Sequence, residues 1–314
     1  MPADRADADI VRWMTPGSTI ELEGLTKRYG DRRGIEDVTL QVRSGEVFGF
    51  LGPNGAGKTT TIRTMLDLLR PSAGRCTLLG LDSHRDVLEL HRRIGYLPGD
   101  FVAYRRMTGR EYLGFFAALR DIPPGAFEVL ADRLSCDLEP RIGSLSHGNA
   151  QKLGLIQALM HDPEILILDE PTQGLDPLVQ HEFHTIVRQA AAEGHTVFLS
   201  SHVLPEVERT CDRVGIIGEG RLVAVEDIGA LKAKAVRTIE FHFARPVPEG
   251  SFADVAGVSD LEAHGDIVRC TVRGPVDALI KAAARFEVVD IESQQPGLEE
   301  LFLHYYRPDG EVLP

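Results

Sequence analysis

A glycine-rich segment that ends in lysine and threonine is the clearest chemical signal in the sequence. It matches G-x-x-x-x-G-K-[ST] at every fixed position, in the run Gly52-Pro53-Asn54-Gly55-Ala56-Gly57-Lys58-Thr59. Glycines let successive backbone N–H groups point at phosphate oxygens. Lys58 can then reach the β- and γ-phosphates, while the Thr59 hydroxyl can bind Mg²⁺. The segment, together with Thr60, predicts a nucleoside triphosphate site; a glycine turn without nucleotide is the weaker alternative.

Two adjacent carboxylates follow a second apolar run, at residues 165–168. Because sites in parallel sheets gather where strands end, Asp169 is placed to hold Mg²⁺ through water. Glu170 is placed to orient or deprotonate an attacking water. An apolar run followed by Asp-Glu is a weak signal alone, and surface carboxylates are its ordinary interpretation. The phosphate loop makes the catalytic interpretation the better one.

A histidine follows a third apolar run, at residues 197–199. A lone histidine is more often structural than catalytic. His202 ends another predicted sheet strand, however, so its side chain is expected to meet the γ-phosphate and to share the site with Glu170 and Lys58.

The elements that must position these residues alternate between strands and helices. Alternating or continuous apolar runs predict strands at 19–25, 38–42, 46–51, 165–168 and 196–199. Helical spacing predicts helices at 58–69, 177–193 and 203–210. Such alternation favours an α/β fold with a largely parallel sheet covered by helices.

The remaining segments differ in texture and suggest the domain organisation. Residues 97–162 predict a helical insert, with helices at 109–120, 124–134 and 146–161. Residues 236–314 predict a small α+β domain, with strands at 238–244, 266–272 and 287–291 and helices at 276–285 and 298–305. We interpret residues 1–17 as a flexible leader, and 18–235 as the main domain.

Composition limits the possible partners and location. The chain has 314 residues, a formal net charge of −13 and 43% hydrophobic residues, so it has no overall attraction for nucleic acid or anionic lipid. No apolar run reaches the 18 residues of a spanning helix, and the N-terminus does not resemble a secretory signal. The four cysteines lie far apart, which favours reduced, buried thiols. These features lead us to expect a cytoplasmic protein.

With these residues considered together, residues 18–235 resemble the nucleotide-binding domain of ABC transporters. The most specific segment is similar to the family's L-S-G-G-Q signature and reads Leu145-Ser146-His147-Gly148-Asn149-Ala150-Gln151-Lys152. Ser146 and Gly148 match this signature, whereas His147 and Asn149 depart from it. In the family the signature opens a helix that points at the γ-phosphate held by the other subunit. The alternative is that Ser146 only caps a helix.

Further family elements follow in order. Tyr29 resembles the aromatic residue that stacks on adenine, although a plain strand-end tyrosine is the alternative. Asp176, in Gly174-Leu175-Asp176, resembles the loop that crosses the dimer interface, and His202 resembles the switch histidine. Gly99 occupies the place of the usual glutamine after Leu-Pro. Asp100 either takes over the function of that glutamine or is only a solvated loop carboxylate.

The resemblance implies a P-loop NTPase core, with a mostly parallel sheet, an antiparallel β subdomain, the helical insert and the C-terminal α+β appendage. It also implies an ATPase that uses ATP and Mg²⁺ and pairs head to tail with a second copy. Residues 296–306 are similar to the C-terminal extension of daunorubicin-resistance and sodium-efflux type exporters, in which the membrane permease is a separate chain. This implies a peripheral position on the cytoplasmic face of the cell membrane, and no nucleic acid partner.

Two rival functions belong to other classes. One is a soluble ABC protein that acts on ribosomes or DNA; the single phosphate loop, the missing coiled coil and the net charge of −13 argue against it. The other is a non-hydrolysing nucleotide sensor or scaffold. The presence of Lys58, Asp169, Glu170 and His202 together argues against that, while Gly99 and His147 leave some room for it. The sequence does not identify a cargo.

Overall fold

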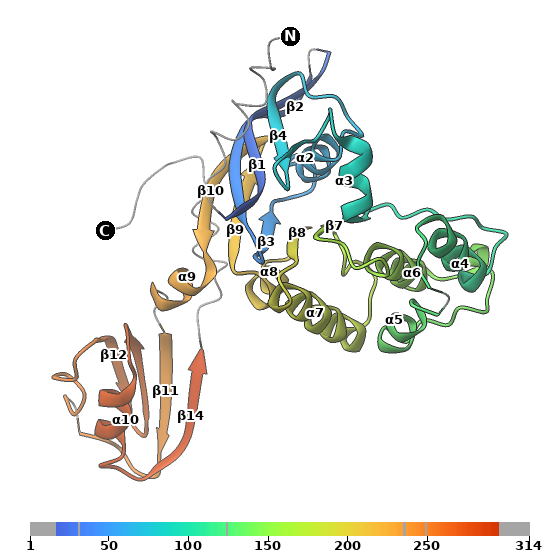
Figure 1. Ribbon diagram of the computed structural model, residues 1–314. Coiled ribbons are helices and arrows are strands. Elements are labelled where there is room, and N and C mark those ends of the chain that lie inside the picture. The colour runs from blue at the N-terminus through green and yellow to red at the C-terminus, as the bar shows by residue number, and fades with distance from the viewer. Residues whose placement is uncertain (1–16, 31, 124, 235–236, 249, 295–314) are drawn as a thin grey trace. The chain divides into compact units, whose positions relative to one another are not determined.

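The computed structural model describes residues 17–30, 32–123, 125–234, 237–248 and 250–294 (Figure 1). The chain divides into two units, residues 1–226 and residues 227–314. The division after Glu226 precedes the boundary expected from the sequence at residue 235.

A six-stranded sheet forms the centre of the first unit, in the order β10-β9-β3-β8-β7-β6. β8 pairs in parallel with β3 and β7, β3 also with β9, and β7 also with β6. The strands are β3 (Val47–Leu51), β6 (Ile94–Leu97), β7 (Ile165–Asp169), β8 (Thr196–Ser201), β9 (Arg213–Gly218) and β10 (Arg221–Asp227). Every residue of β3, β7 and β8 is buried, as expected for parallel strands covered on both faces.

A second, antiparallel sheet lies against the first in the order β2-β1-β4-β5. Its strands are β1 (Ser18–Tyr29), β2 (Arg32–Arg43), β4 (Ala73–Leu78) and β5 (Leu81–Asp82). The two sheets share one apolar core, in which Ile20 and Leu22 of β1 join Phe48 and Phe50 of β3 and Phe198 of β8. The Phe48 and Phe198 rings stack at 5.8 Å. This core fixes the end of β3 from which the phosphate loop begins.

Helices account for the rest of the first unit. Four of them border the sheets: α2 (Lys58–Met65), α3 (Val87–Arg93), α7 (Pro177–Ala192) and α8 (Leu204–Thr210). The insert contains α4 (Gly109–Leu119), α5 (Glu128–Arg133) and α6 (His147–Leu159), and no strand occurs among its described residues from 98 to 162. Thr108 and Glu111 form a reciprocal capping box that starts α4. The helical insert predicted from the sequence is therefore present (Figure 1).

The second unit is a small α+β structure. Its antiparallel sheet has the order β12-β13-β11-β14, from β11 (Arg237–Phe243), β12 (Val258–His264), β13 (Ile267–Val272) and β14 (Val288–Gln294). It also contains α9 (Ile228–Lys234) and α10 (Asp277–Ala283). Phe241 and Phe243 of β11 stack with Phe252, which gives this unit a core of its own. The α+β character expected for the C-terminal segment is confirmed.

Several element predictions were incomplete. The helix expected at 58–69 ends at Met65, because the chain turns at Asp67 with φ of 53° and Leu69 N–H bonds back to Arg63 O. β4, β5, β6, β9, β10 and β12 were not predicted, because they are short, their apolar pattern is interrupted or their residues are only half-buried. The helices α3 and α9 were not predicted either. The expected leader and the expected helix at 298–305 lie outside the described residues.

All four cysteines are free and buried, as expected. Burial raises the pKa of Cys76 to about 12 and that of Cys136 to about 11, so neither thiol is a ready nucleophile. Among the described residues, no helix combines the length and hydropathy that crossing a membrane requires.

Candidate active site

The phosphate loop connects the buried strand β3 to the first turn of α2. Gly55 and Gly57 adopt φ of 83° and 110°, a region that favours glycine. A Cβ added at Gly52 would lie 2.5 Å from Ile217 O, so only glycine fits where the loop passes β9. The sequence folds here into a tight turn whose following helix directs its N-terminus, with its free N–H groups, toward the loop.

Lys58 is held at the centre of this loop. Its side chain is 5% exposed, and Nζ donates to Gly52 O at 2.5 Å and to Pro53 O at 3.2 Å. Nζ also lies 3.1 Å from Glu170 Oε1 and forms an ion pair with it. The geometry of this contact is not that of a hydrogen bond, and this buried oxygen has no hydrogen-bond partner among the described residues. The ammonium is therefore aimed into the loop beside the second predicted carboxylate.

The oxygen atoms expected to hold a metal meet at the end of β7. Thr59 Oγ1 donates to Asp169 Oδ2 at 2.7 Å, and Ser200 Oγ donates to Asp169 Oδ1 at 2.5 Å. Ser200 Oγ in turn accepts from Glu170 N–H at 3.1 Å, so one buried hydroxyl fixes both acidic residues. Burial and the nearby Asp169 charge raise the pKa of Tyr96, which keeps that phenol neutral.

Glu170 is held in an uncommon conformation between two cationic or titratable side chains. Its φ of 50° lies in the left-handed region, which costs free energy for a residue with a Cβ. Glu170 Oε2 lies 2.8 Å from His202 Nδ1. Gln151 of α6 donates to Glu170 O at 3.3 Å and to Pro171 O at 3.4 Å. These contacts hold the carboxylate between Lys58 and His202.

A pocket of about 320 Å³ opens over the phosphate loop. Its described lining contains most of the predicted nucleotide-contacting residues together with two that the sequence did not indicate, Arg33 and Gly34; the full set is Tyr29, Arg33, Gly34, Pro53, Asn54, Gly55, Gly57, Lys58, Thr59, Thr60 and Glu170. The antiparallel pairing of β1 with β2 sets Arg33 opposite Arg28, one position from Tyr29. A prediction of this hairpin from the sequence could have placed Arg33 near the nucleotide site.

Among the predicted residues that the pocket lining lacks, three belong to the starts of α6 and α7. Ser146 caps α6 by accepting from Asn149 N–H at 3.3 Å, and Asp176 caps α7 by accepting from Leu178 and Val179 N–H. A Cβ at Gly148 would lie 2.3 Å from Gly174 O, so the start of α6 presses on the loop after the acidic pair. Ser146, Gly148 and Asp176 therefore form a separate surface of this chain.

Gly99 lies beside Asp169, where a side chain would reach the metal ligands. A Cβ at Gly99 would lie 3.4 Å from Asp169 Oδ2. Asp100, the next residue, is exposed. Its carboxylate forms no hydrogen bond or ion pair with the described residues.

Asp100→Ala should therefore lower the steady-state ATP hydrolysis rate by less than about tenfold, because at most one supporting polar contact is lost, on the order of 1.4 kcal/mol. Phosphate release at saturating Mg-ATP measures this, with Asp132→Ala, an exposed position of α5, as the control. A variant as inactive as Glu170→Gln would show that Asp100 replaces the missing glutamine.

Comparison with known proteins agrees with this geometry. The family model described as "ABC transporter" matches residues 35–173. The bacitracin transport ATP-binding protein of Bacillus licheniformis is 38% identical over 226 residues, covering 71% of this chain and 74% of the relative. Nod factor export ATP-binding protein I of Paraburkholderia xenovorans is 34% identical, covering 92% of this chain and 97% of the relative. The chain belongs to the ABC transporter family.

A solved structure of an ATP-binding subunit of an ABC transporter supports the same assignment. Its sequence is 30% identical and its TM-score is 0.64; the match covers 68% of this chain and 92% of the chain in the solved structure. The chain is thus an ABC ATP-binding protein, and ATP hydrolysis is the reaction of its family.

The residues present fit both ATP and Mg²⁺. The glycine cradle and its adjoining helix N-terminus offer N–H groups to phosphates, and the Glu170 Oε1 atom without a hydrogen bond lies beside Lys58. Thr59 Oγ1 and Asp169 Oδ2 supply adjacent hard oxygen ligands, the type that Mg²⁺ prefers.

Proposed function

We propose that this chain is the motor subunit of an ABC export system, with catalytic residues Lys58, Glu170 and His202. The observation that carries the proposal is the continuous set of contacts from Lys58 Nζ to Glu170 at 3.1 Å and from Glu170 to His202 at 2.8 Å, next to the Thr59–Asp169 pair. These are the groups that ATP hydrolysis needs in one place: a cation for phosphate, a base for water and oxygen ligands for a metal.

In the proposed reaction, ATP binds with its phosphates in the loop of Gly52–Thr59 and its adenine on Tyr29. Lys58 leaves the loop carbonyls and binds the β- and γ-phosphate oxygens. Glu170 accepts a proton from the water that attacks the γ-phosphorus, and the bond to the ADP oxygen breaks. His202 orients Glu170 and donates to the γ-phosphate. Mg²⁺ held by Thr59 and Asp169 supplies charge neutralisation of the phosphates when bound.

The second copy of the chain supplies the remaining contacts. Ser146 and Gly148 begin α6 at the surface, and the N-terminus of this 13-residue helix attracts an anion. In a head-to-tail dimer it would face the γ-phosphate held by the partner, with Asp176 in the loop that crosses the interface. ATP then favours the closed dimer, because the nucleotide contacts both chains, and hydrolysis allows the dimer to open.

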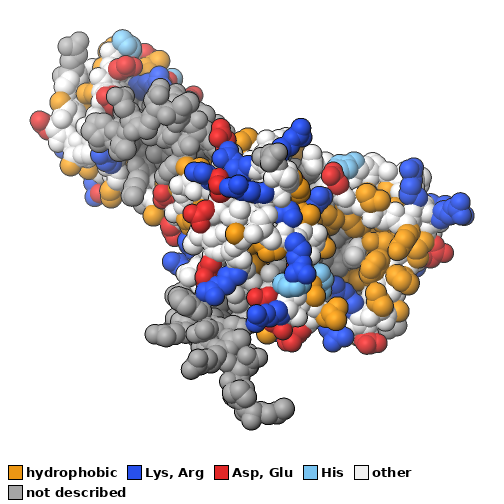
Figure 2. Space-filling model, turned by 90° about the horizontal axis from the view of Figure 1, so that it is seen from above, with side chains coloured by type: hydrophobic (Ala, Val, Ile, Leu, Met, Phe, Trp, Pro, Cys, Tyr) orange, Lys and Arg blue, Asp and Glu red, His pale blue; other side chains and the backbone are white. Residues whose placement is uncertain are grey.

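We also propose where the membrane permease docks. Five large apolar side chains of the helical insert and α3 are 51% to 83% exposed: Leu88, Val102, Tyr104, Phe115 and Leu119. Apolar side chains gather at the side of the first unit that holds this segment (Figure 2). A patch of this kind is a typical protein interaction site.

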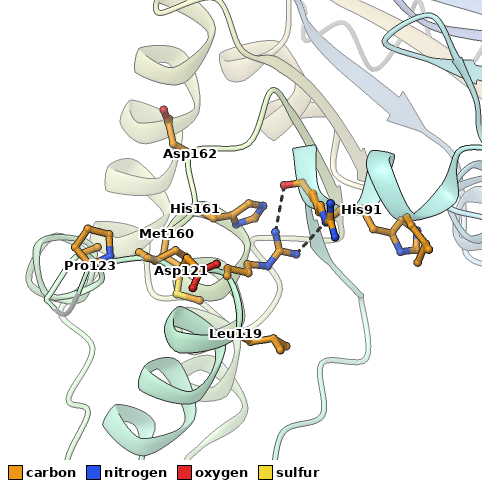
Figure 3. Close-up of a pocket in the computed structure, with 12 residues that line it drawn as sticks. His91, Leu119, Asp121, Pro123, Met160, His161 and Asp162 are labelled. Carbon is orange, nitrogen blue, oxygen red and sulfur yellow. Dashed lines mark hydrogen bonds between the residues drawn. The ribbon is translucent and has the colours of Figure 1, made fainter.

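A groove of about 980 Å³ adjoins this patch, between α3 and the ends of α4 and α6. Arg120 lines the groove and donates to His91 O and Arg92 O. Figure 3 shows Leu119 and His91 among the other lining residues. A cytoplasmic helix of the permease is the occupant we propose, which would place this chain at the cytoplasmic face of the membrane.

Leu119→Glu should abolish co-purification with a membrane permease while ATP hydrolysis by the isolated chain stays within about twofold, because the side chain lies away from the phosphate loop. Capture from host membranes in mild detergent, with identification of a polytopic protein at near-equal stoichiometry, measures this. Val129→Glu, on exposed α5 outside the patch, is the matched control.

Unchanged recovery by Leu119→Glu would move the docking site elsewhere. Recovery of the wild-type chain with ribosomes or nucleic-acid proteins alone would favour the soluble alternative. The cargo we propose is a drug- or antibiotic-like molecule, as the name of the bacitracin transport relative suggests.

A further inference from the structure

Arg33 lines the nucleotide pocket beside Tyr29, and the proposed reaction does not use it. We propose that Arg33 is a nucleotide-binding residue that contacts the α- and β-phosphates, and that Glu219 competes with the nucleotide for its guanidinium. This inference rests on the proposed function only in requiring that the pocket binds Mg-ATP.

The hairpin between β1 and β2 determines the position of Arg33. Arg28 pairs with Arg33, and Tyr29 pairs with Arg32. A Cβ added at Gly34 would lie 2.8 Å from Tyr29 Cε2, so the backbone next to Arg33 runs close against the tyrosine ring. Arg33 therefore belongs to the Tyr29 end of the pocket, away from Lys58, which the loop carbonyls hold at the other end.

Charge favours an anion at this position. Among the described lining residues, Arg33 and Lys58 are the cations and Glu170 is the carboxylate, and Glu170 lies 3.1 Å from Lys58. The Arg33 end of the pocket therefore has a positive side chain with no acidic lining residue in contact. A nucleotide bound with its base on Tyr29 would bring its α- and β-phosphates between the two cations, where a guanidinium can donate two hydrogen bonds.

The present partners of Arg33 are weak and exchangeable. Nη2 lies 3.4 Å from Glu219, whose side chain is 90% exposed, and Nη1 lies 3.8 Å from Glu36. Glu36 already pairs with Arg28 at 3.1 Å and with Arg221 at 2.8 Å, so it does not depend on Arg33. An exposed ion pair contributes little free energy, and a phosphate group is a stronger acceptor.

The first experiment measures dissociation constants for Mg-ATP and Mg-ADP by displacement of a fluorescent nucleotide. Arg33→Ala should weaken both by about tenfold, because the α- and β-phosphates are common to the two nucleotides. Arg33→Lys should recover part of the loss. Arg32→Ala removes the same charge one position away, outside the pocket lining, and should leave both constants within twofold.

The second experiment removes the competitor. Glu219→Gln should tighten Mg-ATP binding by about two- to threefold, and the same change in an Arg33→Ala background should have no effect, because the competition needs both side chains. Equal tightening in both backgrounds would reduce Glu219 to a long-range charge effect and overturn the competition.

Three results would overturn the role of Arg33 itself: unchanged affinities in Arg33→Ala, an equal loss in Arg32→Ala, or a loss confined to Mg-ATP. Failure of the wild-type chain to bind Mg-ATP would instead overturn the proposed function. Thermal unfolding of each variant separates a loss of nucleotide contact from a loss of the β1–β2 hairpin.

Discussion

Glu170→Gln should lower the rate of ATP hydrolysis by about a thousandfold while the dissociation constant for Mg-ATP changes by less than threefold. A general base contributes roughly 10²- to 10⁴-fold, and glutamine keeps the size of the side chain but cannot accept the proton. Binding should persist because Lys58 and the loop N–H groups remain. Loss of the carboxylate also frees Lys58 from its contact at 3.1 Å, which favours the nucleotide.

Single-turnover phosphate release measures the chemical step, and fluorescent nucleotide displacement measures binding. Glu193→Gln, at the exposed end of α7, is the matched control and should retain wild-type rates. A Glu170→Gln variant with more than a tenth of the wild-type rate would assign the base to another group. His202, which lies 2.8 Å from the same carboxylate, would be the next residue to replace.

Lys58→Met should raise the dissociation constant for Mg-ATP by more than about a hundredfold, a loss of about 2.7 kcal/mol. Methionine fills a similar volume but removes the cation that the loop aims at the phosphates. The substitution also leaves Glu170 next to the phosphate site without its neighbouring cation, and two anions then oppose each other in a partly buried pocket.

Isothermal titration with Mg-ATP checks this prediction, and circular dichroism confirms that the variant is folded. Lys281→Met, which removes an exposed lysine paired with Asp277 in the second unit, should bind normally. Retention of wild-type affinity by Lys58→Met would mean that backbone N–H groups alone hold the phosphates. Lys58 would then contribute to catalysis only by stabilising the transition state.

The parts of the fold that could be predicted from the sequence are those with a local pattern of apolar residues or glycines. The fully buried strands β3, β7 and β8 have continuous apolar runs in the sequence, and the phosphate loop has glycines at Gly55 and Gly57, where the positive φ favours them. β10 was missed because its residues are at most half-buried and show no continuous apolar run. Its place is decided by pairing with distant strands, which a local pattern does not contain.

The same difference separates the predicted from the unpredicted site residues. Lys58 and Thr59 stand in a fixed local motif, whereas Arg33 reaches the pocket only because β2 folds back on β1. Ser200 was not predicted as a site residue, because its hydrogen bonds to Asp169 and Glu170 join residues that are 31 and 30 positions apart in sequence. Contacts of that range come from the sheet order, not from residue spacing.

Gln151 connects the two ends of the proposed machinery. It lies on α6, the helix whose first turn would face the partner's nucleotide, and it donates to the carbonyls of Glu170 and Pro171 in its own chain. A shift of α6 on engaging one nucleotide would thus be felt by the base that acts on the other. In the proposed dimer we therefore expect the two sites to bind ATP cooperatively, with the same coupling free energy of binding in both directions.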